Sequence, residues 1–166
     1  MLEKLKKRFT YHEIPDDIFL RYVTQSFCKL KKRYSYICTM NVELLIILST
    51  FSIMIFENYN RPWYLRLFEY IIFVSQKLMG RHSIVMSLGI MQVQVSHFIT
   101  SGDSIYLAVD KISCIYLDAI TENSYSNEAE IVEIIALKYN PSSLYVRQIR
   151  KIYEVISLGG NKNSGC

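Results

Sequence analysis

The longest apolar pattern in the chain runs from Leu44 to Phe56, where no residue is charged. A helix with this sequence is apolar nearly all round, so other elements must pack around it. The pattern therefore predicts a central core helix over residues 41–60, beyond which Pro62 disfavours further helix. Glu57 follows the run directly, so its carboxylate is expected where the buried helix meets a polar turn.

Further helices and one extended segment are predicted on either side of this core helix. Apolar residues recur at helical spacing over residues 15–30, 62–79, 104–121, 128–138 and 142–157. Residues 101–104 resemble a turn and helix cap. From Ile90 to Val95 apolar and polar residues alternate, which predicts a short strand or hairpin where Gly89 allows a close backbone approach. We therefore expect an α+β fold that is mainly α-helical, with a small β-hairpin beside the central helix.

Length and composition indicate one folded domain. The chain has 166 residues, of which 51% are hydrophobic and 20% charged. A chain of this length can bury one substantial core. We expect a single domain over residues 1–158, with an N-terminal helical extension over 15–40 and the core over 41–157. Residues 159–166 are polar and rich in glycine, so we expect a flexible tail there.

The formal net charge of +4 is modest. It does not indicate a nucleic-acid partner, although it suits contact with a membrane surface. The apolar run 44–56 is shorter than the about 20 residues that span a bilayer. The basic N-terminus is not followed by an apolar run, so no secretory signal is expected and the protein should be made in the cytoplasm. The sequence indicates no oligomeric state.

No metal or cofactor is expected from the residues that usually hold one. The four cysteines are widely scattered and match no zinc or thioredoxin spacing. The three histidines have no spacing typical of a metal site or a catalytic triad. A glycine-rich phosphate loop and a nucleophile elbow are also missing from the sequence.

Three segments, in this order along the chain, resemble the lysozyme-like superfamily and in particular the lytic transglycosylases. The first is the apolar helix that ends in Glu57. The second, Ser87-Leu88-Gly89-Ile90-Met91-Gln92, resembles the family's Gly-Leu-Met-Gln segment, which lines the saccharide cleft. The third, over residues 138–153, is similar to the family's Tyr-Asn turn and the Tyr-Val-rich helix after it. Together the segments cover roughly residues 41–155.

This resemblance implies a lysozyme-like domain that cleaves peptidoglycan between its amino sugars. It implies that Glu57 is the catalytic acid and then the base, so that one carboxylate performs both proton transfers and the sugar's own 6-hydroxyl closes a 1,6-anhydro ring. Partial burial would raise the pKa of Glu57 and keep it protonated near neutral pH, as a general acid requires. The substrate-binding residues that the resemblance implies are Ser87, Gly89, Met91, Gln92, Tyr139 and Asn140.

Some residues have a second interpretation. A muramidase that hydrolyses the bond would require a second acid besides Glu57, and the candidates are Glu69 and Asp103. Glu69 is more simply an ion-pair partner of Arg61 or Arg66, and Asp103 a helix cap. Glu57 could also be simply a solvent-facing residue at the end of the helix. The helix dipole disfavours an acid at a helix C-terminus. The aromatic residues that follow the core helix are candidates for stacking on sugar rings: Tyr59, Trp63 and Tyr64.

The chain departs from the family in two places, and each keeps an alternative open. Asn58 stands where a serine usually follows the catalytic glutamate, and the 32 positions from Glu57 to Gly89 exceed the usual gap. The long gap also resembles the peptidoglycan glycosyltransferases, although Asn58 stands in place of their second acid. A non-enzymatic alternative is a helical module that binds a membrane or a partner protein through 44–56 and the basic run 29–33. The enzymatic interpretation implies action at the cell envelope.

Overall fold

In the residues that the structure describes, the fold combines the helices α3 to α7, a helical stretch at residues 21–26 and a small sheet. This computed structural model describes residues 21–26, 28, 40–60, 63–81, 83–122 and 127–160. Its elements are α3 (Met40–Asn60), α4 (Trp63–Leu78), β1 (Met86–Leu88), β2 (Val93–Val95), α5 (Ser101–Thr121), α6 (Glu128–Tyr139) and α7 (Ser143–Gly160). The mainly helical α+β class is thereby confirmed. Residues 21–26 of the predicted first helix are helical, while the basic run 29–33 lies outside the described residues.

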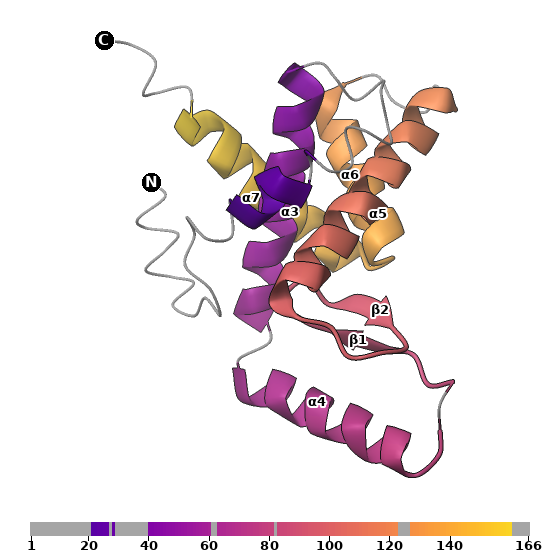
Figure 1. The fold of residues 1–166 in the computed structure, drawn as a ribbon. Coiled ribbons are helices and arrows are strands. Elements are labelled where there is room, and N and C mark those ends of the chain that lie inside the picture. The colour runs from indigo at the N-terminus through magenta and orange to yellow at the C-terminus, as the bar shows by residue number, and fades with distance from the viewer. Residues whose placement is uncertain are drawn as a thin grey trace.

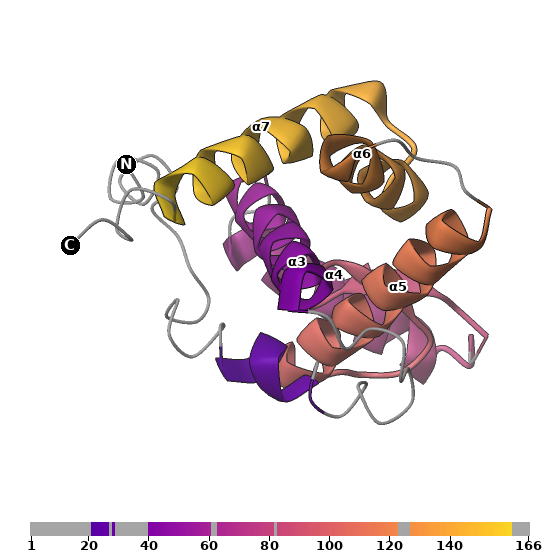
Figure 2. The ribbon, with the colours of Figure 1, turned by 90° about the horizontal axis from the view of Figure 1, so that it is seen from above.

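The helix α3 is the centre of the fold. It packs against α5, α6 and α7, which lie beside it in two perpendicular views (Figures 1 and 2). Ile46, Ile53 and Met54 are fully buried, whereas Leu44 at the start of the apolar run is 54% exposed. The prediction of a core helix is confirmed. The non-enzymatic alternative required the run 44–56 to be exposed for binding a membrane or a partner protein. These neighbouring helices cover most of the run, so it is not available for that contact.

The two strands form an antiparallel hairpin. The paired residues are Met86 with Val95, Ser87 with Gln94 and Leu88 with Val93. The predicted extended segment began at Ile90, but residues 89–92 form the turn and the first strand lies before them. Ile90 and Met91 are fully buried, and the Met91 N–H donates to Ser104 Oγ at 3.1 Å. Packing against the start of α5 therefore sets the turn, which alternation alone did not reveal.

The helix α5 begins at Ser101, earlier than the predicted residue 104. Thr100 is its N-cap, and its Oγ1 accepts a hydrogen bond from the Asp103 N–H at 3.1 Å. The Asp103 carboxylate accepts one from the Thr100 N–H, also at 3.1 Å. This reciprocal capping box satisfies two of the backbone N–H groups that a helix start leaves open. The residues predicted as a turn are therefore the first turn of the helix.

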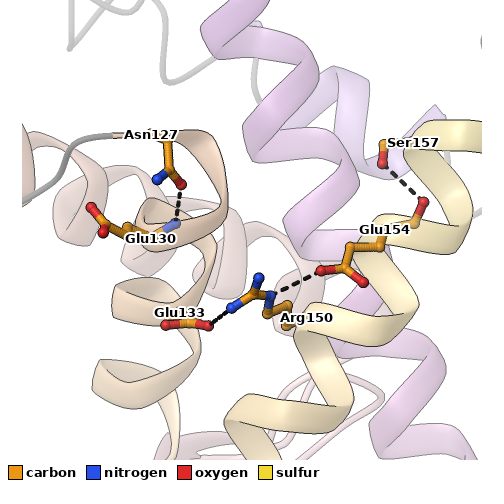
Figure 3. Close-up of polar contacts among 6 residues, drawn as sticks. All are labelled: Asn127, Glu130, Glu133, Arg150, Glu154 and Ser157. Atoms are coloured by element: carbon orange, nitrogen blue, oxygen red, sulfur yellow. Dashed lines mark hydrogen bonds and ion pairs between the residues drawn. The ribbon is translucent and has the colours of Figure 1, made fainter.

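The helices α6 and α7 pack against each other and share a group of polar contacts (Figure 3). Arg150 of α7 forms ion pairs with Glu133 of α6 and with Glu154 of its own helix. Asn127 caps α6, and its Oδ1 accepts a hydrogen bond from the Glu130 N–H at 3.1 Å. Both helices occur where they were predicted, and α7 continues to Gly160, past the predicted start of the tail.

The helix α4 lies at one end of the molecule, on the far side of the hairpin from the other helices (Figure 1). It packs against β1. Its bounds agree with the predicted helix up to the turn at Gly80. Within the described ranges, no helix combines the length and the apolar content that crossing a bilayer requires.

Candidate functional site

A cavity of about 440 Å³ lies where the end of α3, the hairpin, α5 and the α6–α7 turn meet. Its lining is mostly polar and consists of Glu57, Ser87, Gln92, Gln94, Lys111, Lys138, Tyr139, Asn140 and Pro141. Five of the predicted site residues are in this list: Glu57, Ser87, Gln92, Tyr139 and Asn140. They come from three segments that are far apart in the sequence, so the fold brings the three motifs to one place.

The carboxylate of Glu57 is held inside the protein. Glu57 lies in the last turn of α3 and is only 7% exposed, which excludes the solvent-facing alternative. The negative charge of Glu57 affects the pKa of two nearby tyrosines. Burial raises the pKa of Tyr139 and of Tyr145 well above the usual range, and the negative charge of Glu57 raises both further. Both phenols therefore keep their protons at neutral pH, and the buried Tyr145 hydroxyl has no hydrogen-bond partner among the described residues.

Tyr145 reaches the site from α7 and was not among the predicted site residues. Its ring packs edge-on against Phe56 of α3, with 4.9 Å between ring centroids. This contact joins α3 to α7 directly beside Glu57. The sequence signal that could have identified Tyr145 is its position shortly after the Tyr-Asn turn, in a helix whose start lies next to the acid.

Tyr139 ties α6 to the hairpin turn. Its hydroxyl donates a hydrogen bond to the Met91 carbonyl oxygen at 2.6 Å. The phenol thus anchors the hairpin turn, while Tyr139 also lines the cavity together with Glu57. Lys111 of α5 lies over the Tyr139 ring, with Nζ 4.4 Å from the centroid, and burial lowers the pKa of Lys111. Lys111 was not among the site residues predicted from the sequence, because its position beside Tyr139 depends on how α5 packs on α6.

Gln92 has an unusual backbone conformation at the cavity wall. Its φ is +51°, the only positive value among the described residues other than glycine. The side-chain Nε2 donates to the Gly89 carbonyl oxygen at 3.0 Å and to Glu69 Oε2 at 3.3 Å. Its Oε1 is buried and accepts no hydrogen bond from the described part of the chain. A buried amide oxygen of this kind is available to an N–H or O–H group of a ligand.

Gly89 and Met91 are not among the residues that line the cavity. Gly89 has a φ of +77°, and a Cβ at this position would lie 2.5 Å from Ser104 Cβ and Oγ. The expected close backbone approach is therefore present. The Met91 side chain is fully buried. These two residues shape the turn that presents Gln92, and the structure does not bring them to the position of a ligand.

Glu69, Asp103 and Tyr64, which the sequence also suggested, are not among the residues that line the cavity. Glu69 accepts a hydrogen bond from Gln92, and its predicted partner Arg61 lies outside the described residues. Asp103 caps α5. Tyr64 is exposed on α4 and does not line the cavity. The side chains of Tyr59 and Trp63 are outside the described part, so their predicted stacking stays a prediction.

In the part of the chain that the structure describes, no three His, Cys, Asp or Glu side chains gather in a way that could hold a metal ion. Comparisons with protein-family models, with curated proteins and with solved structures find no match to this chain. The lysozyme-like resemblance therefore depends on the residues and on their arrangement alone.

Proposed function

We propose that this protein cleaves the glycosidic bond between amino sugars in peptidoglycan or a related glycan, with Glu57 as general acid and base. The observation that carries the proposal is a buried carboxylate at a polar cavity, next to residues from both of the other family-like segments. Ser87 and Gln92 come from the hairpin, and Tyr139 and Asn140 from the end of α6. Peptidoglycan lies in the cell envelope, which would be the site of action.

One carboxylate is enough for the mechanism that the resemblance implies. Glu57 gives its proton to the oxygen that links two sugars, and the bond to the anomeric carbon breaks. The resulting carboxylate then takes the proton from the sugar's 6-hydroxyl, whose oxygen attacks that carbon and forms a 1,6-anhydro ring. Among the described residues that line the cavity, Glu57 is the only acid. This favours the lytic transglycosylase reaction over hydrolysis by two acids.

The remaining lining residues suit an amino-sugar polymer. The free Oε1 of Gln92 can accept a hydrogen bond from an N-acetyl N–H, and Ser87 and Asn140 offer further polar groups. Lys111 and Lys138 add positive charge to the same wall. A glycan that carries carboxylates fits this charge better than a neutral one. The cavity therefore supports an acidic, N-acetylated glycan as substrate.

The proposal is tested by mass spectrometry of the products released from purified cell-wall sacculi. Wild-type protein should release muropeptides with 1,6-anhydro ends. Glu57→Gln keeps the shape of the side chain but removes the proton donor, so the rate should fall by roughly a hundredfold or more. The matched control is Glu122→Gln, which changes an exposed acid at the end of α5 and should leave the rate unchanged.

Two results would contradict the proposal. Product release by Glu57→Gln at the wild-type rate would exclude this residue as the acid. Release of products with reducing ends, together with a large loss of rate in Glu69→Gln, would instead indicate hydrolysis with Glu69 as a second acid.

A further inference from the structure

The helix α4 presents its apolar side to solvent. Its exposed large apolar residues are Tyr64, Leu65, Leu67, Phe68, Ile71, Val74 and Leu78, with Phe68 61% and Leu78 84% exposed, and the exposed Met79 follows in the turn directly after the helix. At about 100° per residue these positions cover roughly half of the helix circumference, and Ser75 is the only other exposed residue among them. A surface helix normally buries its apolar stripe and exposes its polar side. In α4 the arrangement is reversed.

Polar contacts hold α4 in this orientation. Arg66 is buried at 3% exposure, on the side of the helix that faces the protein. Glu69 accepts a hydrogen bond from Gln92 at 3.3 Å. The Tyr70 hydroxyl donates to the Ile99 carbonyl oxygen, also at 3.3 Å. Rotating the helix to bury its apolar side would break these contacts and expose the buried Phe73, so the outward apolar side belongs to the fold.

The apolar surface continues beyond the helix. Val85 and Phe98 are exposed large apolar residues on the segments next to the hairpin, and the Phe98 ring lies 5.2 Å from the ring of Tyr70. Ten large side chains that are each about half open leave an apolar surface on the order of 1,000 Å². The largest patch on an ordinary monomer is roughly 300–600 Å². A surface of this size marks an interaction site.

The charges around this surface favour anionic lipid. Among the described residues from 63 to 100, the exposed basic residues are Arg81 and His97, and no Asp or Glu is exposed. Lys77 of α4 is half-buried and adds a further cation, whereas Arg66 is buried on the side of the helix that faces the protein. Cations at the edge of an apolar helix face are attracted by anionic headgroups.

The shape of the surface favours a bilayer over a second copy of the chain. Two helices that pack together cover a stripe of roughly 100° on each, so a partner α4 would leave much of the apolar side of this helix open. A bilayer interface can cover the whole side. α4 is about 24 Å long, and none of the other described helices and strands lies beyond it at that end of the molecule (Figure 1). It can therefore lie flat in the interface without spanning the bilayer.

We propose that α4, with Val85 and Phe98, is a membrane-docking face that lies in the interface of an anionic lipid bilayer. This inference does not depend on the glycosidic reaction, because none of these residues lines the Glu57 cavity. Docking would hold the rest of the domain beside the membrane with the cavity still open.

Flotation of the full chain with lipid vesicles tests this proposal. Wild-type protein should float with vesicles of phosphatidylcholine and phosphatidylglycerol, and less with phosphatidylcholine alone. The triple variant Phe68→Gln, Ile71→Gln, Leu78→Gln keeps good helix formers and should bind about a hundredfold more weakly. Its activity on sacculi should equal that of wild type.

The matched control replaces exposed apolar residues elsewhere. Leu137 of α6 and Leu144 of α7 are also exposed, and the double variant Leu137→Gln, Leu144→Gln should float like wild type. Absence of flotation by wild-type protein, or an equal loss in the control, would overturn the proposal. Light scattering during gel filtration tests whether a second copy of the chain binds this face instead. If wild-type protein forms a dimer that only the α4 variant abolishes, and does not bind vesicles, the face is a dimer interface.

Discussion

At the residue scale, two backbone conformations hold the turn between β1 and β2. Gly89 and Gln92 both have positive φ, at +77° and +51°. Glycine adopts this conformation at little cost, whereas another residue loses roughly 1–2 kcal/mol. The two hydrogen bonds from Gln92 Nε2 offset that cost. Strained residues of this kind gather at functional sites because the surrounding structure fixes them there, which agrees with the position of Gln92 at the cavity.

The two glycines with positive φ make a matched pair for measuring the close approach at Gly89. Gly80 has a φ of +81° with no atom within 4 Å of an added Cβ, whereas at Gly89 that Cβ would lie 2.5 Å from Ser104. Gly80→Ala should lower the free energy of unfolding by about 1–2 kcal/mol. Gly89→Ala should lower it by about 3 kcal/mol or more, since the clash adds to the strain. Urea unfolding measures both values, and equal losses would mean that the turn relaxes away from Ser104.

At the element scale, the hairpin is held in place by the helices around it. Met91 is bonded on one side to Ser104 of α5 and on the other to Tyr139 of α6. A two-stranded hairpin by itself is only marginally stable in water. The start of α5 therefore matters to the site, because it carries Ser104 in its first turn.

The capping box of α5 predicts a measurable effect at this scale. Thr100→Ala removes the hydroxyl that accepts from the Asp103 N–H, so the free energy of unfolding should fall by about 1 kcal/mol. Thr121→Ala is the same change at the other end of α5, where the hydroxyl only bonds back to the Leu117 carbonyl. Alanine is the better helix former there, so this control should lose nothing. Thermal unfolding compares the two, and a loss as large in the control would contradict the assigned cap.

At the scale of the whole molecule, Glu57 is surrounded by parts of the chain that only the complete fold assembles. α3 supplies the acid, α6 and α7 supply Tyr139 and Tyr145, and the hairpin supplies Gln92. The same assembly leaves α4 outside the helical bundle with its apolar side open. The molecule thus has a polar cavity and a separate apolar face, and each suits a different kind of partner.

The buried tyrosines predict how the stability of the whole fold depends on alkaline pH. The pKa of Tyr145 is raised in the folded state by burial and by Glu57, while an unfolded tyrosine titrates near pH 10. The stabilisation from this group is therefore complete below about pH 10 and is lost as the pH rises towards the folded pKa. Tyr145→Phe should make the fall in unfolding free energy above pH 10 shallower by up to about 1.4 kcal/mol per pH unit.

Denaturant unfolding at a series of pH values measures this slope. The control is Ile149→Val, which removes a methylene from a buried residue of the same helix and does not titrate. It should lower stability by about 1 kcal/mol at every pH, parallel to wild type. An unchanged slope in Tyr145→Phe would mean that Tyr145 does not titrate differently in the folded and unfolded states.

Local chemistry made much of the fold predictable. The uncharged run after Leu44 can only be stable when it is surrounded, so it predicted α3 as the core helix, and helical spacing located α4 to α7. Gly89 was identified because a backbone approach of this kind needs a residue without a side chain. The start of α5 was placed too late, because the Thr100–Asp103 capping box precedes the periodic apolar residues that define a helix in sequence.

The sequence by itself determined which segments form helices, that Glu57 follows an apolar core, and which motifs accompany it along the chain. Only the tertiary structure decided that Glu57 is buried at a cavity, that Tyr139 anchors Met91 across 48 positions of sequence, and that Lys111 and Tyr145 join them. It also decided that α4 turns its apolar side outward. The physical reason is that periodicity shows which residues share a face of an element, whereas contacts between distant elements determine what that face meets.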